Sequence, residues 1–131
     1  MQQLLRLADQ LELRVVERAG RTRGGFDPVA GTIRLAPGMS RRTARSVLAH
    51  ELGHAQLGHH PTALASARAR QERRADEWAA RRLITPAAYA EAEAARGTHL
   101  ASLAFELDVT IELVAAFQRL LRQDPGPRAA A

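Results

Sequence analysis

The stretch LAHELGHAQLGHH, residues 48–60, constrains the fold more than any other part of the sequence. Within it, His50, Glu51 and His54 form the pattern H-E-x-x-H. If this segment is an α-helix, its two histidines lie on one face and can reach a single metal ion. Glu51 then lies beside the ion, where a carboxylate can accept and return a proton. The opposite helix face is apolar, so we expect it to pack against the rest of the protein.

A catalytic zinc site needs a third protein ligand, and His60 is the first candidate. It lies ten residues after His50, as the third histidine does in the longer pattern H-E-x-x-H-x-x-G-x-x-H. However, Leu57 stands where that pattern has its glycine. No methionine follows Met39 to form the turn that accompanies the longer pattern. We therefore reject His60 as a ligand.

Glu72 is the second candidate, in the segment QERRADEWAARRLI. On a helix, Glu72 and Asp76 share a stripe with the small residues Ala75 and Ala79, whereas Glu77 falls on the opposite side and should face solvent. Carboxylates on an inward stripe need a partner, which a metal ion supplies. We predict that Glu72 is the third ligand and that Asp76 accepts the outer N–H of a ligand histidine. The alternative is that both acids pair with surface arginines.

Composition restricts the other possibilities. The chain has 131 residues and no cysteine, so we expect one domain without disulfides or thiolate ligands. No apolar run approaches membrane-spanning length, and the N-terminal segment is typical of an amphipathic helix, so we expect a cytoplasmic protein. All 19 basic residues are arginine and the net charge is +5. This charge indicates either an acidic partner or a general use of arginine for lysine; we expect no direct binding of nucleic acid.

The patterns of apolar and turn-forming residues predict an α+β domain over residues 1–123 and a disordered tail over 124–131. Ser40 is the predicted N-cap of the H-E-x-x-H helix, and Thr85-Pro86 predicts another helix start. Strands are predicted at residues 13–18 and in a hairpin that turns at Asp27-Pro28 and Gly31. The remaining helices are predicted at residues 4–13, 67–83, 86–96, 100–107 and 111–121.

Two segments together carry a family resemblance: FDPVAGTIRLAPGMSRRTARSVLAHELGHAQLGHH and, further on, ERRADEWAARRLITPAAY. The sequence from about Gly25 to Leu121 resembles the ImmA/IrrE family of small, gluzincin-like metallopeptidases. Arg74 departs from the family pattern, which often has a further glutamate at that position. The resemblance implies a zincin-like minimal metallopeptidase domain with a small N-terminal antiparallel sheet and a mostly helical C-terminal half. It also implies site-specific cleavage of a helix-turn-helix transcriptional repressor, often encoded nearby in phage or mobile-element regions.

The resulting hypothesis is a zinc-dependent endopeptidase in which Zn²⁺ is bound by His50, His54 and Glu72. Glu51 would act first as general base and then as general acid. An extended protein substrate would lie along a sheet edge, adding a strand to it. The residues predicted to form that edge are Thr32, Ile33, Arg34 and Leu35.

Three points stay open at the level of sequence. The residue that stabilises the developing oxyanion is unassigned, with Tyr89, His59, His60 and His99 as candidates. A non-catalytic zinc regulator that binds a repressor without cutting it fits the same residues. A DNA-binding helix-turn-helix is the third alternative, because residues 100–121 have its spacing with Asp108 at the turn. The second helix of this pair has few side chains suited to reading bases, so we interpret it as core packing.

Overall fold

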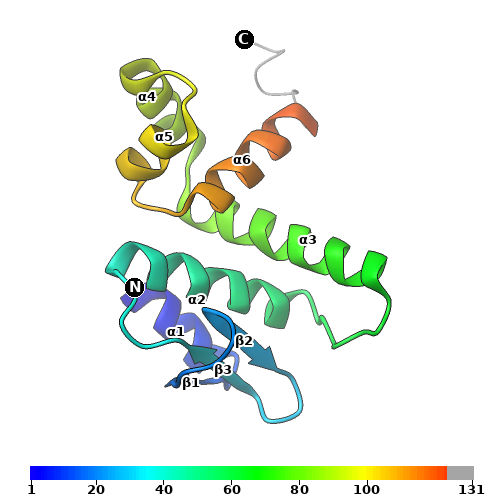
Figure 1. The fold of residues 1–131 in the computed structure, drawn as a ribbon. Helices are drawn as coiled ribbons and strands as arrows, with labels where there is room; N and C mark the ends of the chain where they lie inside the picture. The colour runs from blue at the N-terminus through cyan, green and yellow to red at the C-terminus, as the bar shows by residue number, and fades with distance from the viewer. Residues whose placement is uncertain (124–131) are drawn as a thin grey trace.

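The structure is a computed structural model that describes residues 1–123; the predicted tail, residues 124–131, lies outside the described residues. Figure 1 shows a small sheet at one end of the molecule and helices stacked above it. The elements are α1 (Gln2–Gln10), β1 (Arg14–Glu17), β2 (Gly24–Asp27), β3 (Thr32–Leu35), α2 (Arg41–Gln56), α3 (Ala65–Leu83), α4 (Pro86–Arg96), α5 (Leu100–Leu107) and α6 (Ile111–Gln123).

The predicted helix starts are confirmed by their capping contacts. The Ser40 hydroxyl accepts a hydrogen bond from the backbone N–H of Thr43 (3.2 Å), and the Thr85 hydroxyl accepts one from that of Ala88 (3.1 Å). Pro86 follows as the first residue of α4, where its missing N–H costs nothing. The sequence therefore encodes the start of the helix that carries His50.

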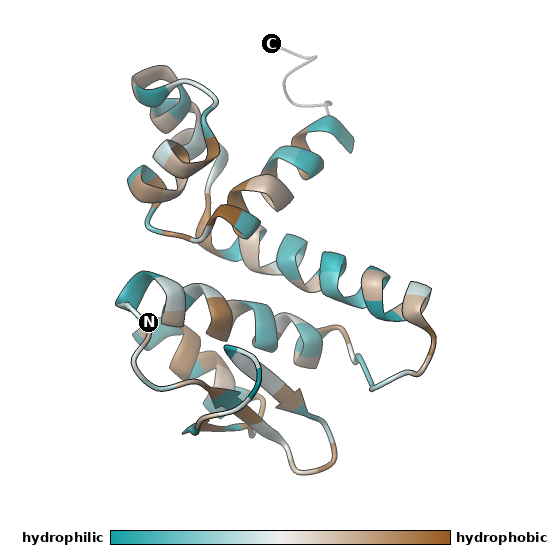
Figure 2. Ribbon diagram, in the orientation of Figure 1, coloured by the Kyte–Doolittle hydropathy of each residue, from teal (hydrophilic) through white to brown (hydrophobic). Residues whose placement is uncertain are grey.

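Helix α2 lies between the sheet and α3, which makes it the central element of the fold (Figure 1). Leu48 and Leu52 are fully buried. In Figure 2, hydrophobic and hydrophilic stretches alternate along α2. Helix α1 covers the same core with its buried residues Leu4 and Ala8. Because α2 is covered on two sides, polar side chains in its middle are held in a buried environment.

The three strands form a mixed sheet in the order β1-β3-β2. Strand β1 pairs with β3 in parallel, and β2 pairs with β3 antiparallel. The predicted fold class is confirmed, but the sheet is mixed and not purely antiparallel. The prediction that Thr32–Leu35 forms a sheet edge is wrong, because β3 is central and pairs on both sides. The edge beside α2 is β2.

Glu77 on α3 does not face solvent, contrary to the prediction. Its carboxylate accepts a hydrogen bond from Nε of Arg119 on α6 (3.3 Å), and its side chain is only 18% exposed. Helix α6 packs across α3 and so covers the side that a solitary helix would expose. The pair therefore links α3 to α6.

Helices α5 and α6 form part of the core, as predicted. Leu113, Val114 and Phe117 of α6 are buried. Two of its polar side chains have partners within the protein: Gln118 donates to the Tyr89 hydroxyl (3.1 Å), and Glu112 forms an ion pair with Arg23 (3.6 Å). These contacts occupy side chains that a DNA-reading helix would need.

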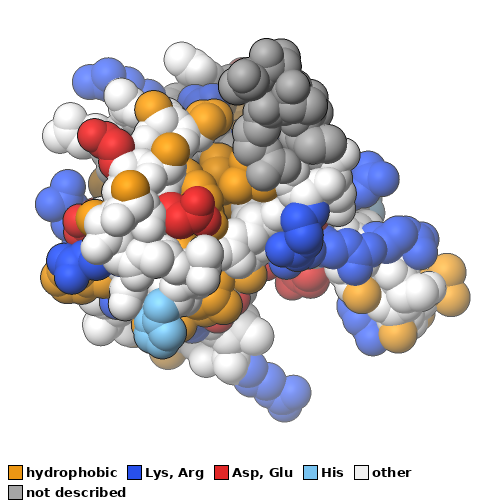
Figure 3. Space-filling model, turned by 90° about the horizontal axis from the view of Figure 1, so that it is seen from above, with side chains coloured by type: hydrophobic (Ala, Val, Ile, Leu, Met, Phe, Trp, Pro, Cys, Tyr) orange, Lys and Arg blue, Asp and Glu red, His pale blue; other side chains and the backbone are white. Residues whose placement is uncertain are grey.

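Charged side chains of both signs lie on the face of the molecule that Figure 3 shows. Arginine side chains lie at its margin and in a run on its right side, and acidic and apolar side chains lie between them. Within residues 1–123, none of the helices has the length and apolar character needed to cross a membrane.

Candidate metal centre

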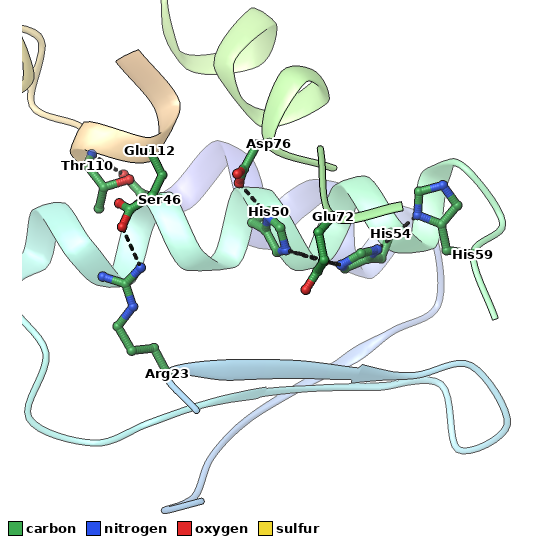
Figure 4. Close-up of polar contacts among 9 residues, drawn as sticks. All are labelled: Arg23, Ser46, His50, His54, His59, Glu72, Asp76, Thr110 and Glu112. Atoms are coloured by element: carbon green, nitrogen blue, oxygen red, sulfur yellow. Dashed lines mark hydrogen bonds and ion pairs between the residues drawn. The ribbon is translucent and has the colours of Figure 1, made fainter. Parts of the chain in front are cut away.

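The two histidines of H-E-x-x-H lie one turn apart on α2 and point in the same direction (Figure 4). The Nε2 atoms of His50 and His54 are 3.1 Å apart, and their rings are nearly perpendicular, with an interplanar angle of 88°. Both rings lie at the wall of one cleft. This is the arrangement that the spacing of the motif predicts for two ligands of one ion.

Helix α3 brings a third atom that could bind a metal ion to the same point. Oε2 of Glu72 lies 3.0 Å from Nε2 of His50 and 2.5 Å from Nε2 of His54 (Figure 4). Within the described residues, these three side chains form a group that could hold a metal ion. The predicted convergence of His50, His54 and Glu72 is therefore present. Glu51 does not belong to the group, in keeping with a role beside the ion.

Asp76, one turn after Glu72, fixes the orientation of His50. Its Oδ1 atom lies 2.6 Å from Nδ1 of His50, so we place the ring proton on Nδ1, as donor to this carboxylate. When His50 is neutral, its Nε2 then presents a lone pair toward Glu72 Oε2 and His54 Nε2. Lone pairs that face one another repel unless a cation lies among them. The donor set of two imidazoles and a carboxylate fits a metal ion in that position.

The pKa values of His50 and Glu72 in the metal-free protein also show that the site favours a positive charge. Burial alone would lower the pKa of His50, but hydrogen bonds to Asp76 and Glu72 outweigh it and raise this pKa to about 10. The hydrogen bonds with His50 and His54 hold the pKa of Glu72 far below its ordinary value. In the absence of a metal, a proton takes the place of the cation.

Two small residues allow α3 to approach α2 so closely. A Cβ atom added to Gly53 would lie 3.0 Å from the backbone oxygen of Ala75 and 3.3 Å from Cε3 of Trp78. Ala75 itself is fully buried. Gly53 of α2 and Ala75 of α3 thus meet at the closest approach of the two helices. This contact sets the distance over which Glu72 and Asp76 reach the histidines.

Glu51 lies on the side of α2 that faces the sheet. Its side chain is buried, with 6% of the residue exposed, and burial raises the pKa of its carboxyl group. A Cβ atom added to Gly24 of β2 would lie 3.2 Å from Oε2 of Glu51, which places this carboxylate directly below the strand. A buried carboxylate with a raised pKa is a suitable proton acceptor near neutral pH.

The cleft has a volume of about 550 Å³. It is lined by residues 22–26, at and before β2, by His50, Glu51 and His54 of α2, by residues 59–62, between α2 and α3, and by the start of α6. The side chains that could hold a metal ion and Glu51 therefore line one cavity.

Of the open candidates for oxyanion stabilisation, the structure brings only some to this cleft. His59 and His60 contribute to its lining. Tyr89 instead donates to Glu93 (3.2 Å), and His99 caps α5 by accepting from the Ser102 N–H (3.4 Å). Nδ1 of His59 lies 2.9 Å from Nδ1 of His54, a contact that was not predicted from the sequence.

Asp76→Asn is expected to lower zinc affinity by about 10- to 100-fold, because the outer partner of a ligand histidine sets its orientation and basicity. Competition with a chromophoric chelator measures the dissociation constant. Glu77→Gln is the control on the same helix: it weakens the pair with Arg119, so it should lower the melting temperature and leave zinc affinity unchanged. Equal zinc affinity in Asp76→Asn and the parent would contradict the assigned role.

Gly24→Ala is expected to lower both stability and activity. The new Cβ atom would lie 2.5 Å from Cγ1 of Val47 and 3.2 Å from Oε2 of Glu51, so β2 must move away from α2. Overpacking of this kind costs about 1–3 kcal/mol in the free energy of unfolding. Gly25→Ala is the matched control, because its Cβ atom would meet only Arg34, at 3.9 Å. Thermal melts and peptidase assays of the two variants test the difference.

A helix with H-E-x-x-H, a second helix that supplies a carboxylate, and a small sheet beside the cleft define a zincin-like metallopeptidase fold. The family model described as IrrE N-terminal-like domain, a peptidase family, matches residues 8–117. The chain belongs to this family, and its function is of the metallopeptidase type. The resemblance to ImmA/IrrE proteins in the sequence is thereby confirmed. A search of curated proteins found no match.

Proposed function

We propose that the protein is a zinc-dependent endopeptidase that cuts a helix-turn-helix transcriptional repressor at a specific site in the cytoplasm. The observation that carries this proposal is the convergence of Nε2 of His50, Nε2 of His54 and Oε2 of Glu72, with the buried carboxylate of Glu51 in the same cleft. Family membership supports a peptide as the substrate. The repressor is proposed from the resemblance to ImmA/IrrE proteins.

In this proposal, His50, His54 and Glu72 hold the zinc ion. When bound, zinc supplies a Lewis acid that favours attack by water on a carbonyl group at neutral pH. Glu51 accepts a proton from the attacking water at its carboxylate and then donates it to the nitrogen of the leaving amine. The water oxygen first bonds to the carbonyl carbon, and the C=O double bond becomes a single bond. The C–N bond breaks in the second step, when the C=O bond re-forms and the amine nitrogen takes the proton from Glu51. Asp76 keeps the His50 ring in place throughout.

Strand β2 is the proposed binding edge for the substrate backbone. In an antiparallel ladder, alternate residues direct their N–H and C=O groups away from the partner strand. The backbone oxygen of Arg23 accepts from the N–H of Ala36, so Gly24 and Phe26 belong to the outward set. An extended peptide paired with this edge would pass over Glu51 and the three ligands. This edge replaces Thr32–Leu35 in the proposal.

The test is incubation of the purified protein with a repressor encoded beside its gene, followed by intact-mass analysis. We expect one specific cut, no cut with a chelator, and recovery when zinc is added back. Binding of one zinc ion per chain and of the repressor, without any cut, would favour the non-catalytic regulator. Salt-dependent DNA binding without bound metal would overturn both in favour of the helix-turn-helix alternative.

A further inference from the structure

The C-terminal end of α2 turns His59 back toward the metal centre. Gly58 has φ = +69°, and the backbone N–H of Gly58 bonds to the oxygen of Ala55 (3.2 Å). The N–H of His59 bonds to the oxygen of His54 (2.9 Å). These two bonds and the left-handed glycine define a Schellman motif. In this motif the residue after the glycine commonly packs against the residue five positions before it, which here is His54.

The side chains use this contact for a polar interaction. Nδ1 of His59 lies 2.9 Å from Nδ1 of His54, and the ring centroids are 5.1 Å apart (Figure 4). Because Nε2 of His54 faces Glu72 and His50, its ring proton must be on Nδ1 when Nε2 acts as a ligand. His54 is then the donor, and His59 accepts with its Nδ1 lone pair.

Each ligand histidine therefore has a partner for its outer nitrogen. For His50 the partner is Asp76, a carboxylate on α3; for His54 it is His59, on the loop that follows α2. We infer that His59 is a positioning residue of the metal centre, which orients His54 and fixes its tautomer through a neutral imidazole acceptor. This inference rests on the proposed metal centre and assigns no contact between His59 and the substrate.

The difference between the two partners has a chemical consequence. A carboxylate partner adds negative charge behind a ligand, whereas a neutral imidazole adds none. Glu72 already supplies one negative charge to the ligand set. A neutral partner of His54 holds its ring in place and adds no second negative charge. The net positive charge of the bound ion and its ligands, on which Lewis acidity depends, is therefore not lowered further.

The test compares the zinc affinity of His59→Leu, His59→Asn and His60→Asn with that of the parent, by competition with a chelator. His59→Leu removes the acceptor, so we expect a loss of about 10- to 100-fold. In His59→Asn the side-chain oxygen can occupy the position of Nδ1, so affinity should recover at least in part. His60, the adjacent residue, has no such contact with His54, and His60→Asn should bind zinc as the parent does. Absorption spectra of the Co²⁺-substituted proteins should shift in the same order.

Two variants of Gly58, which change the backbone conformation next to His59, test the same inference without a change to the His59 side chain. A Cβ atom at position 58 would meet nothing within 4 Å, so Gly58→Ala acts only through the positive φ angle. Asparagine adopts this conformation more readily than alanine. We expect Gly58→Ala to weaken zinc binding and Gly58→Asn to do so less. Parent-like zinc affinity and Co²⁺ spectra in both His59→Leu and Gly58→Ala would overturn the inference. A parent protein that binds no zinc would instead overturn the proposed function.

Discussion

Replacing Glu51 with glutamine is expected to slow peptide hydrolysis by about 10²- to 10⁴-fold, the contribution typical of a general acid–base residue. Glutamine has nearly the same shape as glutamate but cannot accept the proton from water at neutral pH. Because Glu51 lies outside the group of possible ligands, the variant should still bind zinc with the affinity of the parent. Single-turnover rates and zinc titration, measured on the same samples, separate the two properties.

The same substitution should stabilise the metal-free protein at neutral pH. Burial raises the pKa of Glu51 in the folded state, so the folded chain binds more protons than the unfolded chain between the unfolded and folded pKa values. The free energy of unfolding of the parent therefore falls as pH rises through this interval. Glutamine does not titrate, so the advantage of the variant should grow from about pH 4 upward and level off above the folded pKa.

Thermal melts at several pH values in the presence of a chelator measure this second effect. Glu91→Gln, an exposed glutamate on α4, is the control that removes a charge far from the cleft. A Glu51→Gln protein that binds zinc and cuts its target at the parent rate would exclude Glu51 as the proton carrier. Hydrolysis lost together with zinc binding would mean that Glu51 acts through the ligand set.

Replacing Glu72 with alanine is expected to weaken zinc binding by more than the roughly 10- to 100-fold that loss of an outer partner causes, because a ligand itself is removed. Activity should fall together with zinc affinity when the zinc concentration is just sufficient to saturate the parent protein. Oε2 of Glu72 is the only ligand atom that α3 supplies to the group of three. Its removal leaves two histidines on one helix, too few protein ligands for a catalytic zinc site.

Stability gives a readout of this variant that needs no substrate. A ligand that binds only the folded state stabilises it by about 2.7 kcal/mol at a concentration 100 times its dissociation constant. Added zinc should therefore raise the melting temperature of the parent and leave that of Glu72→Ala nearly unchanged. Glu91→Ala is the matched acidic control and should respond as the parent does. An equal response of Glu72→Ala would remove Glu72 from the ligand set.

Local sequence patterns were sufficient for the elements that carry the centre. Ser40, Thr85 and Pro86 mark helix starts by chemistry that acts within one turn, and the structure places the helices there. Helical phase alone directed Glu72 and Asp76 to the same side of α3, where both contact His50. Such predictions succeed because helical periodicity is a property of the local chain.

The errors concern partners that lie far apart in sequence. Strand order in a mixed sheet depends on which strands pair, so nothing local to Thr32–Leu35 reveals that β3 is central. The position of Glu77 on its helix predicts exposure to solvent. The prediction fails because its partner, Arg119, lies on another helix, 42 residues away in sequence. His59 is different: Gly58, at the end of a predicted helix, is itself a signal for the Schellman motif and could have indicated the contact with His54.

The candidate metal centre and the strand proposed to bind the substrate come from different parts of the chain. Every side chain assigned to the centre lies within residues 50–76, a helix, a loop and a second helix. Residues 22–26 and the start of α6 also line the cleft. The start of α6 is held there by a contact between distant parts of the chain, because the N–H of Thr110 donates to the hydroxyl of Ser46, 64 residues earlier. Contacts close in sequence generally form earlier in folding than such distant ones. We therefore expect the folding chain to acquire metal affinity first and hydrolytic competence last, so that a newly made or partly unfolded molecule holds its ion without cutting its neighbours.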